Sequence, residues 1–482
     1  MSYLSRLGVA ALGTAALLSL NAGCDTPGSG TLDMAPRDLA GAQTPTLFSV
    51  TPASAAATGG AKVTIVGTNF DPGATVKIGG VVATNVQYQS SLQLVATVPA
   101  YTGALGPVEV TVQNPSSLKV SRSDVFSYVR VPVTFAATVT RASGHQPTSI
   151  VADDVNGDGG RELILTNSGD STITVLLNNQ NFMSLGTYPT ATNPISLAVA
   201  DLNGDGVKDV VVGCSNSDGH DVDVLRGNGN GAFLAPVHNT VGMNVTGVAV
   251  QDFNSDGKID VAALVRTSGG LLYVMTNNSV NPNVSFTTPY VSYSAGAGPV
   301  SLLLADLNKD GKGDLVAASY SGNLLTSLLW TISGTFVPAT KTAAVGANPV
   351  SLASGDLNGD GSADVVAANF QDATLSMLKG QGDGTFANAV SLTATDKPSA
   401  VAIGDIDGDG KQDIVMASSG RNQIWVLLGK GDGTFEPAQP FIVGQQPWAL
   451  TVADLDRDGK PDVATANLAS GDVSILYNRT QN

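Results

Sequence analysis

The sequence predicts an all-β protein in which a β-sandwich is followed by a seven-bladed β-propeller. A composition of 43% hydrophobic and 13% charged residues with 55 Gly indicates a globular, turn-rich chain. Short apolar runs with many β-branched residues recur along it and are typical of strands. One acidic segment, Asp-x-Asn/Asp-x-Asp-Gly-x-x-Asp/Glu, recurs at intervals of 47 to 54 residues, which indicates an array of like units. Its seven copies begin at Asp154, Asp201, Asp252, Asp306, Asp356, Asp405 and Asp454.

Residues 1–24 have the pattern of a targeting segment. Arg6 gives a positive start, and Leu7–Leu20 is a largely apolar run, too short for a typical membrane span. The following Asn-Ala-Gly-Cys24 resembles a bacterial lipoprotein box, although an Asn stands where that family prefers an aliphatic residue. The resemblance implies lipidation of Cys24 and an exported protein anchored at the bacterial cell envelope or surface. The alternative is an ordinary secretory signal and a secreted protein.

Residues 25–44 are rich in Gly, Pro, Ser, Thr and Ala and are expected to form a flexible tether. Residues 45–129 contain short alternating strands every eight to twelve residues, which indicates a β-sandwich. Its Gly59-Gly60, Gly67-Thr-Asn-Phe70 and closing Phe126-Ser-Tyr128 resemble the IPT/TIG domain, an immunoglobulin-like module. The resemblance implies a spacer or protein-contact role and nothing catalytic.

Residues 132–482 contain the repeats. Each unit has an apolar strand ending at the first Asp, the acidic loop, a second strand, a polar hairpin, a third strand, a Gly-rich turn with Phe and a fourth strand. Four strands in each of seven units describe a propeller. The Gly-x-Gly-x-Gly-x-Phe turn is whole at Gly227–Phe233, Gly380–Phe386 and Gly429–Phe435. These features resemble FG-GAP/VCBS repeats, which build integrin-α-like propellers and some lectins.

The seventh unit stops after its third strand, whereas residues 133–141 precede the first unit and have the pattern of a strand. An open ring would leave two bare edges. We therefore predict that residues 133–141 complete the last blade and close the ring.

The acidic segments predict Ca²⁺ sites, up to seven. Ca²⁺ takes oxygen ligands, and a tight loop can direct side chains 1, 3 and 5 to one point, with a carboxylate at position 9 closing the cage. The glycine at position 6 allows a sharp turn. The two loops with four carboxylates are expected to bind most tightly. The proposed ligands are Asp154, Asn156, Asp158 and Glu162; Asp201, Asn203, Asp205 and Asp209; Asp252, Asn254, Asp256 and Asp260; Asp306, Asn308, Asp310 and Asp314; Asp356, Asn358, Asp360 and Asp364; Asp405, Asp407, Asp409 and Asp413; and Asp454, Asp456, Asp458 and Asp462.

An EF-hand would also begin Asp-x-Asn-x-Asp-Gly, but it needs flanking helices and a Glu at position 12. Position 12 is Leu, Val, Ala, Met or Thr in these copies.

The formal net charge of −16 comes largely from the loops, so bound Ca²⁺ would offset most of it. The negative charge also argues against nucleic acid as a partner. Cys24 and Cys214 offer no disulfide framework, and Cys214 is expected in the core. We expect a monomer.

A binding surface is expected at the ring end opposite the acidic loops, where the second strands lead into polar hairpins. Polar groups around aromatic side chains suit a glycan or a protein partner, as in adhesion or recognition. The hairpins are Asn167–Asp170, Ser215–Asp221, Arg266–Gly270, Ser319–Asn323, Asn369–Asp372, Ser418–Asn422 and Asn467–Asp472. The candidate ligand-face residues are His220, Tyr320, Phe370, Arg421 and Trp448.

Two other functions stay open at this point. No His-Glu-x-x-His, Gly-x-Ser-x-Gly or P-loop occurs, which favours a non-catalytic protein. However, His145 and His220 fall near the expected ligand face, and Asp221 adjoins His220, which is compatible with a polysaccharide hydrolase or lyase. A purely structural surface spacer is the third alternative.

Overall fold

The structure is a computed structural model that describes residues 43–480, apart from positions 102, 104, 131, 217, 218, 332, 333, 340 and 395. The expected signal segment and Cys24, and all but the end of the expected tether, lie outside the described residues. The chain divides into two compact units, one containing most residues up to Ser127 and the other containing Tyr128 onward together with 55–59 and 100–106. No helix in the described part is long and apolar enough to cross a membrane.

The first unit is built from two four-stranded antiparallel sheets, with strand orders β1-β3-β7-β6 and β10-β9-β4-β5. Alternate residues of β3 in one sheet are buried, including Val63 and Ile65, and so are Val76 and Ile78 of β4 in the other sheet. The strands of this part of the chain are β1 (Thr46–Thr51), β2 (Ser54–Ala56), β3 (Lys62–Thr68), β4 (Thr75–Ile78), β5 (Val81–Val82), β6 (Thr84–Ser90), β7 (Gln93–Thr97), β8 (Gly106–Pro107), β9 (Val110–Gln113), β10 (Lys119–Arg122) and β11 (Ser127–Val129).

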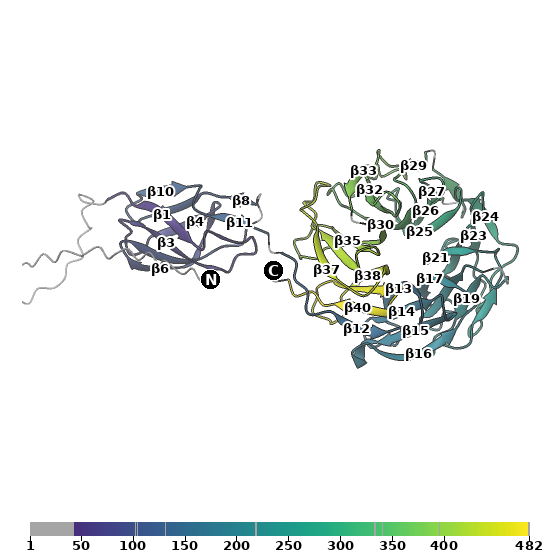
Figure 1. Cartoon of the computed structure of the whole chain (residues 1–482). Helices are drawn as coiled ribbons and strands as arrows, with labels where there is room; N and C mark the ends of the chain where they lie inside the picture. The colour runs from purple at the N-terminus through teal and green to yellow at the C-terminus, as the bar shows by residue number, and fades with distance from the viewer. Residues whose placement is uncertain are drawn as a thin grey trace, which may run out of the picture. The chain divides into compact units, whose positions relative to one another are not determined.

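In the second unit, the described residues from β12 (Val139–Ala142) onward form seven antiparallel sheets arranged in a ring (Figure 1). The first strands of neighbouring sheets contact one another around the centre. These first strands are β13 (Pro147–Asp153), β17 (Pro194–Ala200), β21 (Val245–Gln251), β25 (Pro299–Ala305), β30 (Pro349–Gly355), β34 (Pro398–Gly404) and β38 (Pro447–Ala453). The predicted all-β class, with an immunoglobulin-like unit and repeated four-stranded sheets, is confirmed.

The second strands are the most deeply buried, because a neighbouring sheet covers each of their faces. Every residue of each second strand is buried. They are β14 (Glu162–Asn167), β18 (Asp209–Cys214), β22 (Asp260–Val265), β26 (Asp314–Ser319), β31 (Asp364–Asn369), β35 (Asp413–Ser418) and β39 (Asp462–Asn467). Cys214, at the end of β18, is fully buried and free.

The outer strands complete each sheet. The third strands are β15 (Thr172–Leu177), β19 (Val222–Leu225), β23 (Leu271–Met275), β27 (Leu324–Trp330), β32 (Thr374–Leu378), β36 (Gln423–Leu427) and β40 (Asp472–Leu476). The fourth strands are β16 (Met183–Pro189), β20 (Val237–Asn239), β24 (Val291–Ser294), β28 (Phe336–Pro338), β33 (Val390–Thr393), β37 (Gln439–Ile442) and β12 (Val139–Ala142). One sheet has an extra short strand, β29 (Ala343–Ala344), and a 3₁₀ turn, η1 (Asn178–Gln180), follows β15.

The last sheet takes its outer strand from the residues before the first repeat. Its order is β12-β40-β39-β38, and Val139 pairs with Ile475 across the β12–β40 ladder (Figure 1). Phe135 forms a further bridge to Asn478. The ring is also closed by packing, because one apolar cluster joins Ile150 of the first sheet to Val473 of the last.

Candidate functional site

The seven acidic loops connect the first and second strands of each sheet and share one backbone conformation. Position 6 is a glycine with φ between 75° and 87° in all seven, which only glycine adopts without strain. Position 4 also has positive φ in every loop, including those where Ser255, Lys309 or Arg457 stands there. In every loop, side chains 1 and 5 accept hydrogen bonds from the loop's own backbone, and side chain 3 does so in every loop except the sixth, where Asp407 binds Arg130.

The position-9 carboxylate of each loop is fully buried and connects two parts of its sheet. In the fifth sheet, one oxygen of Asp364 accepts the N–H of Leu357 in the loop at 3.0 Å. The other accepts the N–H of Gly380, just after the third strand, at 2.9 Å. The same pair of bonds recurs in the other six sheets, made by Glu162, Asp209, Asp260, Asp314, Asp413 and Asp462.

Burial dominates the electrostatics of these buried carboxylates. Burial raises the pKa of Asp413 to about 7 and the pKa of Asp260, Asp314 and Asp462 to about 6. The hydrogen bonds from backbone N–H groups favour the ionised form and lower the pKa, but their effect is smaller than that of burial. A cation bound nearby would offset the same cost. The sequence pattern suggests only a metal ligand at position 9, whereas the structure adds a structural role.

Asp364→Ala is expected to lower the free energy of unfolding by about 2–6 kcal/mol, because two buried N–H groups lose their acceptor at about 1–3 kcal/mol each. Urea unfolding in chelator measures this independently of any metal. Asp364→Asn keeps one acceptor and should cost about half as much. The control is Asp383→Ala in an exposed turn, where a change within about 0.5 kcal/mol is expected. Equal losses for the two alanine variants would contradict the structural role of position 9.

Positions 1, 3 and 5 hold the turn together through side-chain acceptors. In the second loop, Asp201 accepts the N–H groups of Gly204 and Gly206, both at 2.8 Å. Asn203 accepts the N–H of Asp205 at 3.0 Å, and Asp205 accepts that of Val207 at 2.8 Å. The loop is therefore formed by its own polar groups, with carboxylate lone pairs left over.

Two loops bring three carboxylates to one point. One oxygen from each of Asp405, Asp407 and Asp409 lies within 4.8 Å of the others, and so does one oxygen from each of Asp454, Asp456 and Asp462. In the second set, Oδ1 of Asp454 is buried without a hydrogen-bond partner. An orphaned carboxylate oxygen among other oxygens is a donor set that fits Ca²⁺, which is bound by oxygen ligands.

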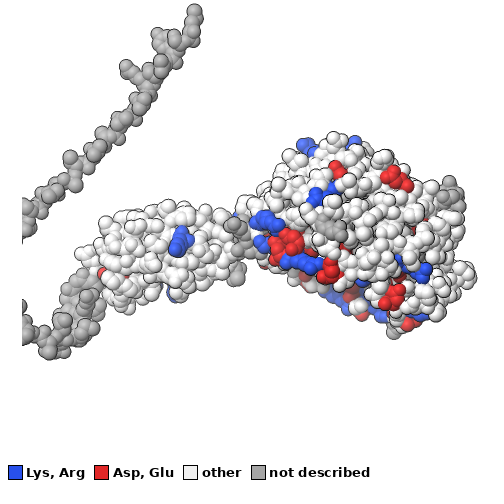
Figure 2. Space-filling model, turned by 90° about the horizontal axis from the view of Figure 1, so that it is seen from below, with Lys and Arg blue, Asp and Glu red and all other residues white. Residues whose placement is uncertain are grey.

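These same two loops also contact arginine side chains. The Arg130 guanidinium is largely buried, binds both oxygens of Asp407, lies 2.9 Å from Asp409 and donates to the carbonyl of Gly429 at 2.7 Å. Arg479 contacts Asp456 and Asp458 of the last loop at 2.7 and 3.1 Å. Figure 2 shows basic side chains adjoining acidic ones on one face of this unit. Ca²⁺ would have to displace these guanidinium groups from the loops with the most carboxylates.

The opposite end of the ring contains a pocket of about 550 Å³ on its axis. It is lined by the start of the first strand of every sheet and by residues that follow several second strands. Each first strand carries a β-bulge at its second residue, which has no partner in the ladder and faces the pocket. The bulge residues are Thr148, Ile195, Thr246, Val300, Val350, Ser399 and Trp448.

The residue after each second strand is held by a repeated backbone bond. Its N–H donates, at 2.9–3.2 Å, to the carbonyl of a residue with positive φ just before the first strand. In the fifth sheet, for example, Phe370 N–H donates to Asn348, whose φ is 55°. The residues placed in this way that line the pocket are Ser215, Arg266, Tyr320, Phe370 and Leu468.

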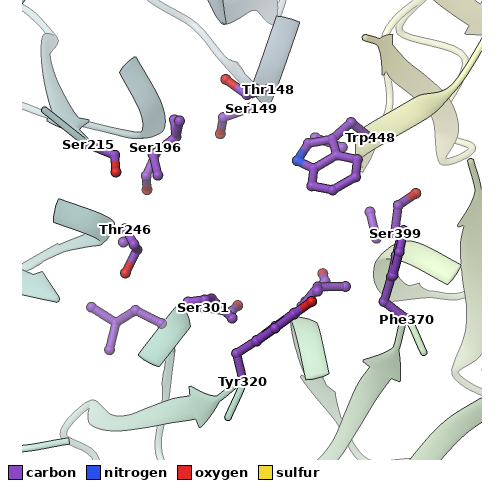
Figure 3. Close-up of a pocket in the computed structure, with 18 of the residues that line it drawn as sticks. Thr148, Ser149, Ser196, Ser215, Thr246, Ser301, Tyr320, Phe370, Ser399 and Trp448 are labelled. Atoms are coloured by element: carbon purple, nitrogen blue, oxygen red, sulfur yellow. The ribbon is translucent and has the colours of Figure 1, made fainter. Parts of the chain in front are cut away.

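The pocket has an aromatic side and a hydroxyl side. Trp448, Phe370 and Tyr320 lie along one side, and the Phe370 and Trp448 rings are 6.0 Å apart, centre to centre (Figure 3). Small hydroxyl residues such as Ser149 and Ser196 lie on the other side. No lining residue among those described is Asp, Glu, His or Lys.

The family models decide the identity of the repeats. A model described as the FG-GAP-like repeat matches residues 154–212, 203–263, 252–317, 306–367, 356–416 and 405–465, and the IPT/TIG domain matches residues 45–128. The chain belongs to the FG-GAP-like repeat family. Five of the six FG-GAP-like matches begin at position 1 of an acidic loop, the second begins at position 3, and all six end at position 12 of the next loop.

This FG-GAP-like protein is also similar to solved structures at low identity. An auxiliary nutrient binding protein from Bacteroides ovatus is 11% identical, with 91% of this chain and 98% of that chain covered and a TM-score of 0.40. Virginiamycin B lyase from Staphylococcus aureus is 12% identical, with 71% and 99% covered and a TM-score of 0.48. A streptogramin B lyase is 14% identical, with 72% and 98% covered and a TM-score of 0.49. Comparison with curated proteins gave no match.

Of the candidate ligand-face residues of the FG-GAP-like ring, Tyr320, Phe370 and Trp448 line the axial pocket, whereas His220 and Arg421 do not. The His220 ring instead lies 4.6 Å from that of His238, whose Nδ1 is 2.6 Å from the buried Asp223. The exposed His145 lies near Asp170 instead, at 3.4 Å. Burial raises the pKa of Asp223.

Asp221 is buried and accepts the N–H groups of Val241 and Gly242 at 3.2 and 3.0 Å. Its carboxylate therefore orders the hairpin.

Of the bulge residues of the first strands, the sequence analysis names only Trp448 and misses the other six. A signal was present, because Asn-Pro-x-Ser occurs at Asn193–Ser196 and again at Asn348–Ser351. The residue x and the serine after it both line the pocket in these two sheets. A repeated Pro before two pocket-lining positions could have placed them at the axis.

Proposed function

We propose that this protein is a non-catalytic carbohydrate-binding protein of the bacterial cell surface, whose axial pocket holds a saccharide and whose acidic loops hold Ca²⁺. The observation that carries the proposal is the axial pocket, where three aromatic rings from separate sheets face a wall of hydroxyl groups. Aromatic rings offer apolar platforms, and a few placed polar groups fix the orientation of a ligand. A sugar ring has both an apolar face and many hydroxyls.

Some pocket hydroxyls already have partners, which orders the wall. Thr148 donates to the carbonyl of Pro194 at 2.9 Å, and Ser399 donates to that of Pro447 at 2.6 Å, so each joins its sheet to the next. Among the described residues, Ser149 and Ser301 make no side-chain hydrogen bond with the protein. They therefore supply donors and acceptors to a ligand without breaking an existing contact.

The lining supports binding rather than turnover. Glycoside hydrolysis generally uses two carboxyl groups beside the scissile bond. The described lining contains no carboxyl group and no imidazole. The alternative from the sequence, a polysaccharide hydrolase or lyase, would have to act outside this pocket, near His220 and His238. Turnover of a polysaccharide that is lost on His220→Ala would establish that alternative instead.

The test is a glycan array probed with full-length protein in Ca²⁺, followed by affinity measurements on the glycans retained. Trp448→Ala is expected to weaken binding by about 2 kcal/mol or more, about thirtyfold, because it removes a central aromatic platform. Tyr88→Ala is the control, since Tyr88 is an exposed aromatic residue of the IPT/TIG unit and should leave affinity unchanged. Glycan binding that is indifferent to Trp448, or a chain that retains no glycan, would rule the proposal out.

We also propose that the protein is attached to the membrane through a lipid on Cys24, with the IPT/TIG unit and the ring outside the membrane. We propose that the protein is a monomer. The motif at the end of the apolar segment supports the lipid anchor. Mass spectrometry of the mature N-terminus tests it, since a lipid-free Cys24 would exclude the anchor.

A further inference from the structure

The axial pocket differs in charge from the rest of the chain. The protein has 40 Asp and Glu against 24 Lys and Arg, and its formal net charge is −16. Among the described lining residues, however, Arg266 alone carries a charge. A pocket that is positive in an acidic protein favours an anionic ligand there, because a cleft lined by one sign of charge attracts ions of the opposite sign.

Arg266 is held by a hydrogen bond at its backbone and by a contact of its side chain with an aromatic ring. It directly follows the second strand of the third sheet, and its N–H donates to the carbonyl of Asn244 at 2.9 Å. Its guanidinium carbon lies 5.4 Å from the centre of the Tyr320 ring, which is a cation–π contact. The side chain is exposed, and no described carboxylate forms an ion pair with it. A guanidinium placed over a ring keeps its edge N–H groups free for a planar acceptor.

A carboxylate is a planar acceptor that fits this edge. An arginine can form two parallel hydrogen bonds with a carboxylate, and such charge-assisted pairs are stronger than neutral ones. The Tyr320 ring that supports Arg266 belongs to the aromatic side of the pocket, with Phe370 and Trp448. A ligand on these rings would therefore have one edge near the guanidinium and its hydroxyls near Ser149 and Ser301.

We propose that the axial pocket selects an acidic saccharide, with a sugar-ring carboxylate paired to Arg266 and the ring packed on the aromatic side. This rests on the proposed carbohydrate-binding function and names the class of sugar. Arg266 is the specificity determinant, and Trp448 and Phe370 are the general platform.

Matched probes separate charge from shape. Full-length protein is titrated in buffer containing Ca²⁺ with three probes of equal length. These are oligogalacturonate, its uncharged methyl ester, and an oligosaccharide that has no carboxylate but carries sulfate groups. Arg266→Gln is expected to weaken oligogalacturonate binding at least tenfold and to leave methyl-ester binding within twofold. Trp448→Ala is expected to weaken both. Arg141→Gln is the control, because Arg141 lies on the outer strand β12 and does not line the pocket.

Each outcome bears on the proposal. Equal loss of acid and ester binding in Arg266→Gln, or tighter binding of the ester than of the acid by the unaltered protein, overturns the charge selectivity and leaves carbohydrate binding standing. Binding of the sulfated probe with the same Arg266 dependence, and no uronate binding, overturns the assignment of a carboxylate. If the unaltered protein binds no glycan on the array, the proposed function is overturned as well.

Discussion

Replacing Val133–Ala142 by a Gly/Ser segment of equal length is expected to lower the free energy of unfolding of the ring by about 5 kcal/mol. The replacement removes the β12 ladder and the side chains of Val133, Phe135 and Val139, each of which packs in a cluster with the last sheet. Burying one such apolar side chain contributes about 1.5–3 kcal/mol. Phe135 also makes an edge-to-face contact with Phe441, with ring centres 4.8 Å apart.

Urea unfolding of full-length protein measures this loss, and hydrogen exchange shows where it falls. The amides of β40 are expected to lose protection first, since β40 would become an exposed edge strand. A Gly/Ser replacement of residues 25–43, which changes the expected tether, is the control and should leave stability unchanged. Equal effects of the two replacements would contradict closure of the ring by β12.

Removing Ca²⁺ is expected to have the largest effect on the intact protein. An ion that binds only the folded state at a hundred times its Kd stabilises it by about 2.7 kcal/mol, so several occupied loops give on the order of 10 kcal/mol. Chelation also leaves carboxylates such as Asp405 and Asp407 close together without a metal. We expect a large fall in melting temperature in chelator that Ca²⁺ reverses. Mg²⁺ should restore little, because it demands a stricter octahedral geometry. A melting temperature that is the same with and without chelator would exclude calcium as a structural component.

Arg130 provides an internal check on the calcium prediction. It already neutralises part of the sixth loop, so Arg130→Ala should be less stable than the unaltered protein in chelator. In saturating Ca²⁺ this difference should shrink or reverse, because the metal gains unobstructed access to Asp407 and Asp409. Arg421→Ala serves as the control. A difference that is the same in both buffers would show that the sixth loop takes no Ca²⁺.

The sequence predicted what is encoded locally and repeated. The glycine with positive φ at position 6 of each loop and the strands on either side of it follow from short motifs at a fixed period. Because the motif occurs seven times, a substitution in one copy does not hide the pattern. The glycines and closing aromatic residues of the IPT/TIG unit are an equally local signal.

Contacts between distant parts of the chain were not predictable from these patterns. Arg130 meets Asp407 across 277 residues, and no local rule selects that partner. The bulge that faces Thr148 toward the axis is a property of the paired strands rather than of either strand alone. The contact between the rings of His220 and His238, which lies on a later strand, likewise has no local signal in the sequence.

The backbone bond at the rim of the axial pocket separates scaffold from chemistry. The N–H that follows each second strand reaches its carbonyl whether the side chain there is Ser215, Arg266, Tyr320 or Leu468. Exchanging such a side chain alters what meets a ligand while the hydrogen bond that holds the position persists. Such an arrangement lets gene copies diverge toward new ligands one blade at a time, with little penalty to folding at each step.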